Sequence, residues 1–171
     1  MSTEIERKFL LADEGWRAGI ATSTRMAQGY LQDVAALRQG MAHASVRVRV
    51  AGSEAWLNVK SVALGIARRE FEYPVPLADA EQMLAELCRG RVEKTRHRVP
   101  VDGHVFEIDE FAGANAGLIV AELELPAVDA PYPRPAWLGR EVSDLPRYYN
   151  VNLIDHPFAA WSAAERAGET A

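Results

Sequence analysis

Charged and apolar residues alternate in several segments, and this alternation constrains the fold more than any other feature of the chain. Glu4 to Leu10 runs Glu-Ile-Glu-Arg-Lys-Phe-Leu, and Ser45 to Val50 alternates valine with arginine. Successive side chains of a β-strand point to opposite faces, so each segment would place charges on one face and apolar groups on the other. We therefore expect a mainly β (α+β) chain whose strands each have one charged face.

Turn and helix signals divide the chain into eight expected strands and one clear helix. The strands are expected at 4–11, 25–32, 45–50, 55–60, 67–75, 92–101, 104–111 and 118–125. Ala51-Gly52-Ser53 and Asp102-Gly103 predict hairpin turns. Apolar residues follow a helical period over 79–89, with Asp79 as the expected cap, whereas Val34 to Ala44 is expected to be a loop. A short polar connection or helix is expected at 13–21, a helix at 145–153, and a frayed or helical tail at 163–171.

The composition is typical of a folded, acidic protein. The 171 residues suit one domain, which we place at residues 1–171 with a core from 4 to 158 and a tail from 159 to 171. The net charge of −5 gives no general attraction for nucleic acid or an anionic membrane, so neither is an expected partner. No apolar run approaches the about 20 residues of a membrane span, and no signal peptide is evident. The single cysteine, Cys88, excludes an internal disulfide. We expect a cytoplasmic protein, and a homodimer is left open.

By strand parity, one face of the predicted sheet collects almost all of its charges. Its acids are Glu4, Glu6, Glu70, Glu72, Glu107, Asp109, Glu122 and Glu124, and its bases are Lys8, Arg47, Arg49, Lys60, Arg68, Lys94, Arg96 and Arg98. Arginine forks suit bidentate contacts to phosphate, and carboxylates on neighbouring strands suit Mg²⁺ or Mn²⁺. The economical arrangement is a closed, eight-stranded antiparallel β-barrel whose charged face lines a wet tunnel and whose apolar face lies outside under helices.

The competing interpretation is an open sheet whose charged face forms surface salt bridges. Each such bridge contributes only about 0–1 kcal/mol, so stability alone is a weak reason for so many charges. Adjacent carboxylates repel each other unless a cation lies between them, and a lysine beside that cation suits a polyanion. The residues therefore favour a site for a metal ion and a phosphate chain.

Short motifs follow one another along these strands. They are Glu4-x-Glu6-x-Lys8, Gln28-Gly29-Tyr30-Leu31, Val46-Arg47-Val48-Arg49, Lys60-Ser61, Arg68-x-Glu70-x-Glu72, Val92-Glu93-Lys94-Thr95-Arg96, Glu107-x-Asp109-x-Phe111, Glu122-Leu123-Glu124 and Arg147-Tyr148-Tyr149-Asn150. In this order the set resembles the CYTH, or triphosphate tunnel metalloenzyme, superfamily, and in particular its short bacterial inorganic triphosphatase-like branch. The resemblance extends over residues 4 to about 158.

The resemblance implies an eight-stranded tunnel that binds a linear triphosphate with one or two divalent cations, Mg²⁺ or Mn²⁺. It implies metal ligands among Glu4, Glu6, Glu122 and Glu124, and less directly Glu70, Glu72 and Asp109. It implies phosphate contacts from Lys8, Arg47, Arg49, Lys60, Lys94 and Arg96, with Arg68 and Arg147 as additions. Catalytic roles fall on Lys8, Glu4, Glu6 and Tyr30, and Tyr30 either pairs with Lys8 or packs as an aromatic residue.

By this resemblance the expected activity is metal-dependent cleavage of tripolyphosphate to pyrophosphate and phosphate. Class IV-type adenylate cyclases and phosphatases of thiamine triphosphate or nucleotides share the tunnel, but the His-Phe pair typical of the cyclases is not found in this sequence. The alternative from another class is a polyphosphate- or nucleotide-binding module without turnover. Lys8 and the carboxylates argue for catalysis.

Overall fold

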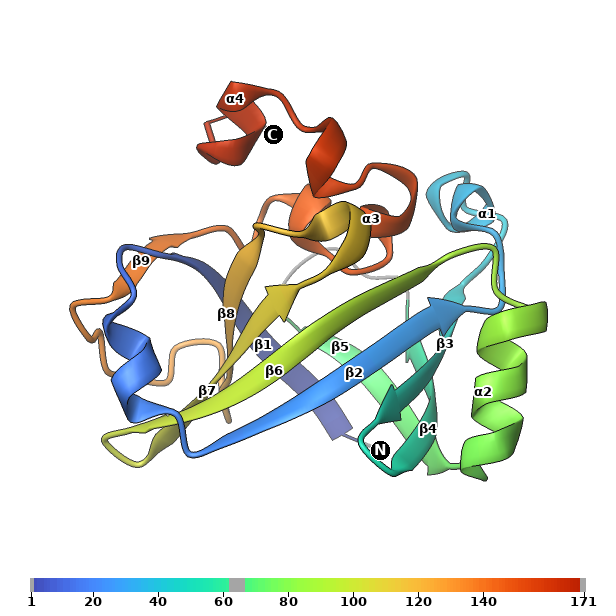
Figure 1. Cartoon of the computed structure of the whole chain (residues 1–171), viewed down its shortest axis with the longest axis horizontal. Helices are drawn as coiled ribbons and strands as arrows, with labels where there is room; N and C mark the ends of the chain where they lie inside the picture. The colour runs from blue at the N-terminus through green and yellow to red at the C-terminus, as the bar shows by residue number, and fades with distance from the viewer. Residues whose placement is uncertain (1, 62–66, 170–171) are drawn as a thin grey trace.

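The structure, a computed structural model, describes residues 2–61 and 67–169, without the side chains of residues 2–4, 34, 38, 67 and 68. Strands dominate these ranges, and the helices are short (Figure 1). Within the same ranges, no helix is both long and apolar enough to cross a membrane. The mainly β architecture expected from the alternating segments is confirmed.

Nine antiparallel strands form one sheet. They are β1 (Ser2–Leu11), β2 (Thr22–Tyr30), β3 (Ala44–Ala51), β4 (Glu54–Ser61), β5 (Ala67–Pro74), β6 (Arg91–Val101), β7 (His104–Phe111), β8 (Ile119–Glu124) and β9 (Leu138–Glu141). Their order is β5-β4-β3-β2-β6-β7-β8-β1-β9. The first eight correspond to the eight expected strands. The ninth was not predicted, because its four residues are too few to show an alternating pattern.

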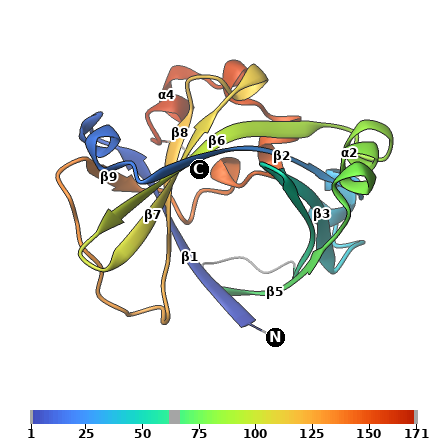
Figure 2. The ribbon, with the colours of Figure 1, turned by 60° about the horizontal axis from the view of Figure 1, so that its bottom comes forward.

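The strand pairings run round in a ring. Residues 2–5 of β1 pair with residues 67–70 of β5, so every strand from β1 to β8 has an antiparallel neighbour on each side. β1 changes partner along its length, since Glu6 to Phe9 pair with β8 and Phe9 and Leu11 pair with β9. Figure 2 shows the strands curving round a common space, into which one face of each strand points.

Both predicted hairpin turns are present. Gly52, between β3 and β4, has a φ of 59°, and the β6–β7 turn places Asp102 at 47° and Gly103 at 79°. Positive φ at both central residues, as at Asp102 and Gly103, or at the first, as at Gly52, matches the twist of the strands that the turn joins. The turns therefore set the register of the two hairpins, in which Val48 faces Leu57 and Arg96 faces Asp109.

The helix α2 (Leu77–Glu86) covers the outer face of β3 and β4. Its buried residues Ala80 and Leu84 pack with Val48 and Ala55, and Cys88 packs against the same cluster. The expected cap was wrong: the helix begins two residues before Asp79, with Pro76 as N-cap and no side-chain cap. The expected loop after β2 contains a short helix, α1 (Val34–Arg38), whose first turn is capped by the Asp33 side chain.

A second core covers the outer face of β1, β7 and β8. Phe9, Phe106 and Leu123 are fully buried there, beneath the 3-10 helix η1 (Gly15–Gly19) and the chain that leads to β9. Trp137 packs edge-on to Phe106, with ring centroids 5.1 Å apart. This part of the apolar face is covered as expected, although mostly by loop and 3-10 structure.

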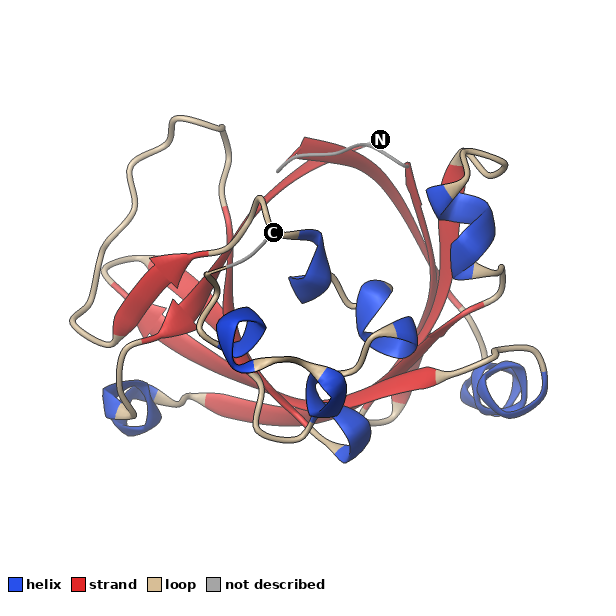
Figure 3. Cartoon of the chain, turned by 90° about the horizontal axis from the view of Figure 1, so that it is seen from above, coloured by secondary structure: helices blue, strands red, loops and turns tan. Residues whose placement is uncertain are grey.

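A third core lies on the inner face, at one end of the ring. The C-terminal segment forms η3 (Pro146–Tyr148), α3 (Asn152–Asp155), η4 (Phe158–Ala160) and α4 (Ala163–Arg166), while η2 (Gly113–Asn115) joins β7 to β8. Tyr148, Leu153 and Trp161 pack against Val92 and Val120, whose strand parity is that of the charged residues. Figure 3 shows these short helices over one end of the strand ring. The inner face is therefore charged along most of its length and apolar beneath the C-terminal segment.

The outer face of β5 departs from the expectation that helices cover the apolar side. Phe71 is 40% and Tyr73 55% exposed. No described helix packs over them, because α2 lies on β3 and β4.

Removal of Trp161 tests whether the inner core holds the C-terminal segment in place. Trp161 is 4% exposed and packs edge-on to Tyr148 and Phe158, with centroids 5.1 Å away in each case. We expect Trp161→Ala to lower the free energy of unfolding by about 3–5 kcal/mol, as for other buried aromatic residues. Urea unfolding measures this, with Tyr73→Ala as the exposed aromatic control. Equal effects of the two substitutions would contradict the inner core.

Candidate active site

A polar cavity of about 690 Å³ occupies the space inside the strand ring. Its wall carries acids and bases from every described strand of the ring except β2, which contributes Met26, Gln28 and Tyr30. The charged lining residues are Glu6, Lys8, Arg47, Arg49, Lys60, Glu70, Glu72, Lys94, Arg96, Arg98, Glu107, Glu122 and Glu124. The parity of the sequence thus placed these side chains on the correct face.

Lys8 lies between two carboxylates. Its Nζ donates to Glu6 Oε1 at 2.6 Å and to Glu122 Oε1 across the β1–β8 pairing. The residue is only 3% exposed. Burial alone would lower the pKa of Lys8, but attraction by Glu122 and Glu6 outweighs it and holds the pKa above its ordinary value. The lysine is therefore a fixed positive charge in the wall.

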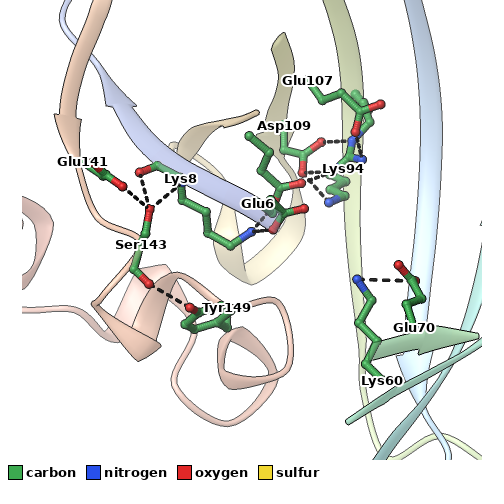
Figure 4. Close-up of polar contacts among 12 residues, drawn as sticks. Glu6, Lys8, Lys60, Glu70, Lys94, Glu107, Asp109, Glu141, Ser143 and Tyr149 are labelled. Atoms are coloured by element: carbon green, nitrogen blue, oxygen red, sulfur yellow. Dashed lines mark hydrogen bonds and ion pairs between the residues drawn. The ribbon is translucent and has the colours of Figure 1, made fainter. Parts of the chain in front are cut away.

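Arg96 and Lys94 share the buried carboxylate of Asp109. Arg96 donates from Nε to Oδ1 and from Nη2 to Oδ2, both at 2.7 Å, and Lys94 Nζ donates to Oδ2. Arg96 also bonds Glu107 and Glu122, which links this group to Lys8. Figure 4 shows Lys94, Asp109 and Glu107 close together beside Glu6. Burial lowers the pKa of Lys94 more than Asp109 raises it, so its pKa lies below the ordinary value.

The charges of Glu122 and Arg96 are stabilised by oppositely charged neighbours in this network. Burial opposes the ionised form of Glu122, yet Lys8, Arg96 and Lys94 together hold its pKa well below the ordinary value. Burial likewise opposes the charge of Arg96, and the attraction of Asp109 and Glu122 raises its pKa well above the ordinary value. Glu122 and Arg96 are thus both ionised at neutral pH, and each helps to keep the other charged.

A second charged group lies on β3, β4 and β5. Glu70 accepts from Asn58 at 3.0 Å and lies 3.4 Å from Lys60 Nζ and 3.8 Å from Arg47 Nη2. Arg49 donates to Glu72 at 2.9 Å and lies over the ring of Trp56, 5.2 Å from its centroid. Burial and the neighbouring Arg47 lower the pKa of Arg49. In Figure 4 the Lys60–Glu70 pair stands apart from the Lys8 group.

Four predicted site residues are not among the described residues that line the cavity. The side chains of Glu4 and Arg68 lie outside the described residues, although their backbones pair with each other in the sheet. Asp109 is fully buried behind Lys94 and Arg96 and is not among the lining residues. Arg147 lies beside the rings of Tyr148 and Trp161, 5.6 and 5.7 Å from their centroids, in the C-terminal segment. Their predicted roles stay predictions.

Tyr30 lines the cavity beside Gln28, whose amide nitrogen lies 3.4 Å from the Tyr30 hydroxyl. The ring of Tyr149 faces Lys8, with Nζ 5.6 Å from the ring centroid. Residues 149–151 line the cavity although they belong to no strand. Trp56 shares the parity of Lys60 and could have been found from it. The only charged residue of β2 is Arg25, whose parity is opposite to that of Gln28, and the motif around Tyr149 gives no sign of which strand it meets.

The donor set suits a divalent cation that arrives with phosphate. Among the side chains that the structure describes, no three acids, histidines or cysteines lie close enough to hold a metal ion by themselves. The carboxylates of Glu6 and Glu122 nevertheless converge on one cation, the Lys8 ammonium, and Glu124 is the register partner of Glu6. Mg²⁺ is commonly bound by one or two carboxylates together with substrate phosphates. The residues present therefore fit such an ion.

The fold and the site together define a mainly β protein with a charged cavity inside its strand ring, and comparison with known proteins agrees. The model of the CYTH domain family matches residues 2–151. The chain is 39% identical over 162 residues to an inorganic triphosphatase of Acetivibrio thermocellus, covering 92% of this chain and 97% of that protein. It is 35% identical over 155 residues to an inorganic triphosphatase of Nitrosomonas europaea, covering 88% and 96%.

Solved structures give the same result. The crystal structure of the inorganic triphosphatase NE1496 superimposes with a TM-score of 0.65 at 33% identity, covering 90% of this chain and 95% of that one. A Hippeastrum protein, a putative adenylyl cyclase with a dominant triphosphatase activity, shares the fold with a TM-score of 0.58 at 15% identity. The chain belongs to the CYTH domain family.

The buried Asp109 gives a test of the paired network. Asp109→Leu leaves Lys94 and Arg96 without their shared carboxylate, and we expect it to lower the free energy of unfolding by about 3–5 kcal/mol. Adding Lys94→Met removes one of the stranded charges, so the double variant should be more stable than Asp109→Leu alone. Urea unfolding of both, with the exposed Asp129→Leu as control, decides the matter. A double variant that is no more stable would count against the pairing.

Proposed function

We propose that this protein hydrolyses inorganic triphosphate to pyrophosphate and phosphate inside the strand ring, with Mg²⁺ or Mn²⁺. The observation that carries the proposal is the cavity wall, where seven lysines and arginines stand among carboxylates on neighbouring strands. A linear triphosphate has several negative charges, and its cleavage depends mainly on positioning and on neutralising charge. The names of the relatives in Acetivibrio thermocellus and Nitrosomonas europaea support the same substrate.

The proposed mechanism assigns binding and orientation to the described side chains. Lys8, Lys94 and Arg96 would bind phosphate oxygens on one side of the cavity, while Arg47, Arg49 and Lys60 would bind them from the other. Water attacks the terminal phosphorus, the bridging P–O bond breaks and pyrophosphate leaves. The basic side chains stabilise the charge that develops on the leaving oxygens.

The carboxylates of Glu6 and Glu122 would hold the metal ion. When bound, it supplies Lewis-acid chemistry, which draws charge from the phosphate oxygens and lowers the pKa of a bound water. Glu4 and Glu124 complete the proposed ligand set, with Glu70, Glu72 and Asp109 as weaker candidates. The cytoplasmic location and the homodimer also stay predictions.

One assay separates this proposal from its alternatives. The purified protein is incubated with tripolyphosphate, ATP, thiamine triphosphate or pyrophosphate, each with Mg²⁺, Mn²⁺ or EDTA, and phosphorus NMR identifies the products. We expect rapid cleavage of tripolyphosphate, much slower cleavage of ATP, and none with EDTA. Cyclic AMP from ATP would establish a cyclase. Tight binding without any product would establish a binding module instead.

Glu6→Gln tests the proposed metal ligand. The substitution keeps the size of the side chain and removes its charge, so we expect metal-dependent phosphate release to fall by orders of magnitude while the melting temperature changes little. Glu81→Gln, on the exposed face of α2, is the matched control and should behave as wild type. Wild-type activity in Glu6→Gln would remove this residue from the site.

Arg49→Ala tests the proposed phosphate contacts on β3. A hydrogen bond to a charged group contributes roughly 1.5–3 kcal/mol, so KM for tripolyphosphate should rise about 10- to 100-fold, with a smaller change in kcat. Arg89→Ala is the control, because the Arg89 side chain is 85% exposed and pairs with Asp33 at the surface. An unchanged KM in Arg49→Ala would exclude a phosphate contact there.

A further inference from the structure

Lys8 has a third neighbour besides its two carboxylates. The ring of Tyr149 faces its ammonium at 5.6 Å from Nζ to the centroid, and the side chain of Lys8 is almost completely buried. A desolvated ammonium over an aromatic face is stabilised by the ring quadrupole, and this attraction does not depend on the carboxylates. Tyr149 is contributed by the C-terminal segment, directly after η3, and it lines the cavity.

Hydrogen bonds through Ser143 connect the Tyr149 side chain to the backbone of Lys8, the residue that the ring faces. The Tyr149 hydroxyl donates to the Ser143 carbonyl at 2.7 Å, and the Ser143 hydroxyl accepts from the Lys8 backbone N–H at 2.9 Å. Ser143 Oγ in turn donates to Glu141 at 2.8 Å, and Glu141 accepts from Arg7 at 2.9 Å. Figure 4 shows this chain of contacts from Glu141 through Ser143 to Tyr149, alongside Lys8. Both the backbone and the ammonium of Lys8 are therefore held by residues 141–149.

The carboxylates that now hold Lys8 are the ones proposed to bind the metal ion. If Glu6 and Glu122 held a divalent cation, their attraction for the Lys8 ammonium would weaken, and the charge of that cation would repel the ammonium. The ring face would stay in place, because the Tyr149 hydroxyl is bonded to a backbone carbonyl of the adjoining turn. An aromatic face is neutral overall, so it can hold the ammonium without competing for the metal.

We propose that Tyr149 is a positioning residue, which holds the Lys8 ammonium against the phosphate chain while the carboxylates bind the metal ion. The inference rests on the proposed function and adds a residue from outside the charged strands to its site. The alternative is a purely structural role, in which the Tyr149 ring fills space and its aromatic character has no effect on Lys8.

Four variants separate these roles. Tyr149→Leu keeps an apolar side chain but removes the quadrupole, Tyr149→Phe keeps the quadrupole, Lys8→Met removes the cation, and the fourth combines Tyr149→Leu with Lys8→Met. Binding of an imido analogue of tripolyphosphate, which resists hydrolysis, is measured by calorimetry with Mg²⁺, and turnover of tripolyphosphate is measured with Mg²⁺. We expect Tyr149→Leu to raise Kd and KM by about 5- to 30-fold, with a smaller change in kcat. Tyr149→Phe should recover most of this loss.

The double variant gives the decisive comparison. If Tyr149 acts through Lys8, adding Tyr149→Leu to Lys8→Met should change Kd by less than about 2-fold, because the interaction is already gone. Equal effects in the two backgrounds would overturn the inference and leave the proposed function intact. Tyr73→Leu, on the exposed outer face, is the matched control. A wild-type protein that neither binds nor cleaves tripolyphosphate would overturn both.

NMR spectroscopy of the wild-type protein tests the contact between Lys8 and Tyr149 directly. Protons on the Lys8 Cε should be shifted upfield by the Tyr149 ring in NMR spectra, and Lys8→Met identifies the signal by its loss. We expect the upfield shift to persist when Mg²⁺ and an imido analogue of tripolyphosphate, which resists hydrolysis, are bound. Disappearance of the shift on binding would show that Lys8 leaves the ring and would overturn the inference, even if Tyr149→Leu fails to fold.

Discussion

The structure depends on the pairing of opposite charges inside the strand ring. Ionised groups taken out of water are costly unless each one has a partner, and here the partners are set by strand register. Lys8 lies opposite Glu122 in the β1–β8 pairing, and Arg96 lies opposite Asp109 in the β6–β7 pairing. The folded chain thus carries ionised groups that need no ligand to stay charged. By the function proposed above, a phosphate chain with a divalent cation would offer them an equivalent set of partners, in which phosphate would replace the acids and the metal would replace the bases.

Stability comes from apolar cores that lie around this charged interior. Two of them cover the outer face of the sheet, under α2 and under the segment that leads to β9. The third lies within the ring, where Tyr148, Leu153 and Trp161 meet the inner face of β6 and β8. Because the charged and apolar parts of the inner face adjoin, the C-terminal segment both buries apolar surface and forms one wall of the cavity.

This arrangement separates two sources of site residues. The strands supply the charges, and their positions follow from the pleat. The chain after β9 supplies Ser143 and Tyr149, which meet Lys8 from a different direction. The family comparison covers both, since the CYTH domain model extends to residue 151. The site is therefore built by nearly the whole length of the chain.

The sequence by itself determined which residues form strands and which face each side chain takes, because the β pleat has a fixed period of two. Parity placed Lys8, Arg47 and Glu122 on the cavity wall, while the short strand β9 and the helix α1 gave no comparable signal. Parity also could not show that Val92 and Val120, on the same inner face, lie under a plug of helices. Only the tertiary structure decided that, together with the contact of Tyr149 with Lys8, because such contacts join distant parts of the chain. The local period of a strand determines which face of the sheet a side chain takes, but the residues that this side chain contacts are determined by the packing of the whole fold.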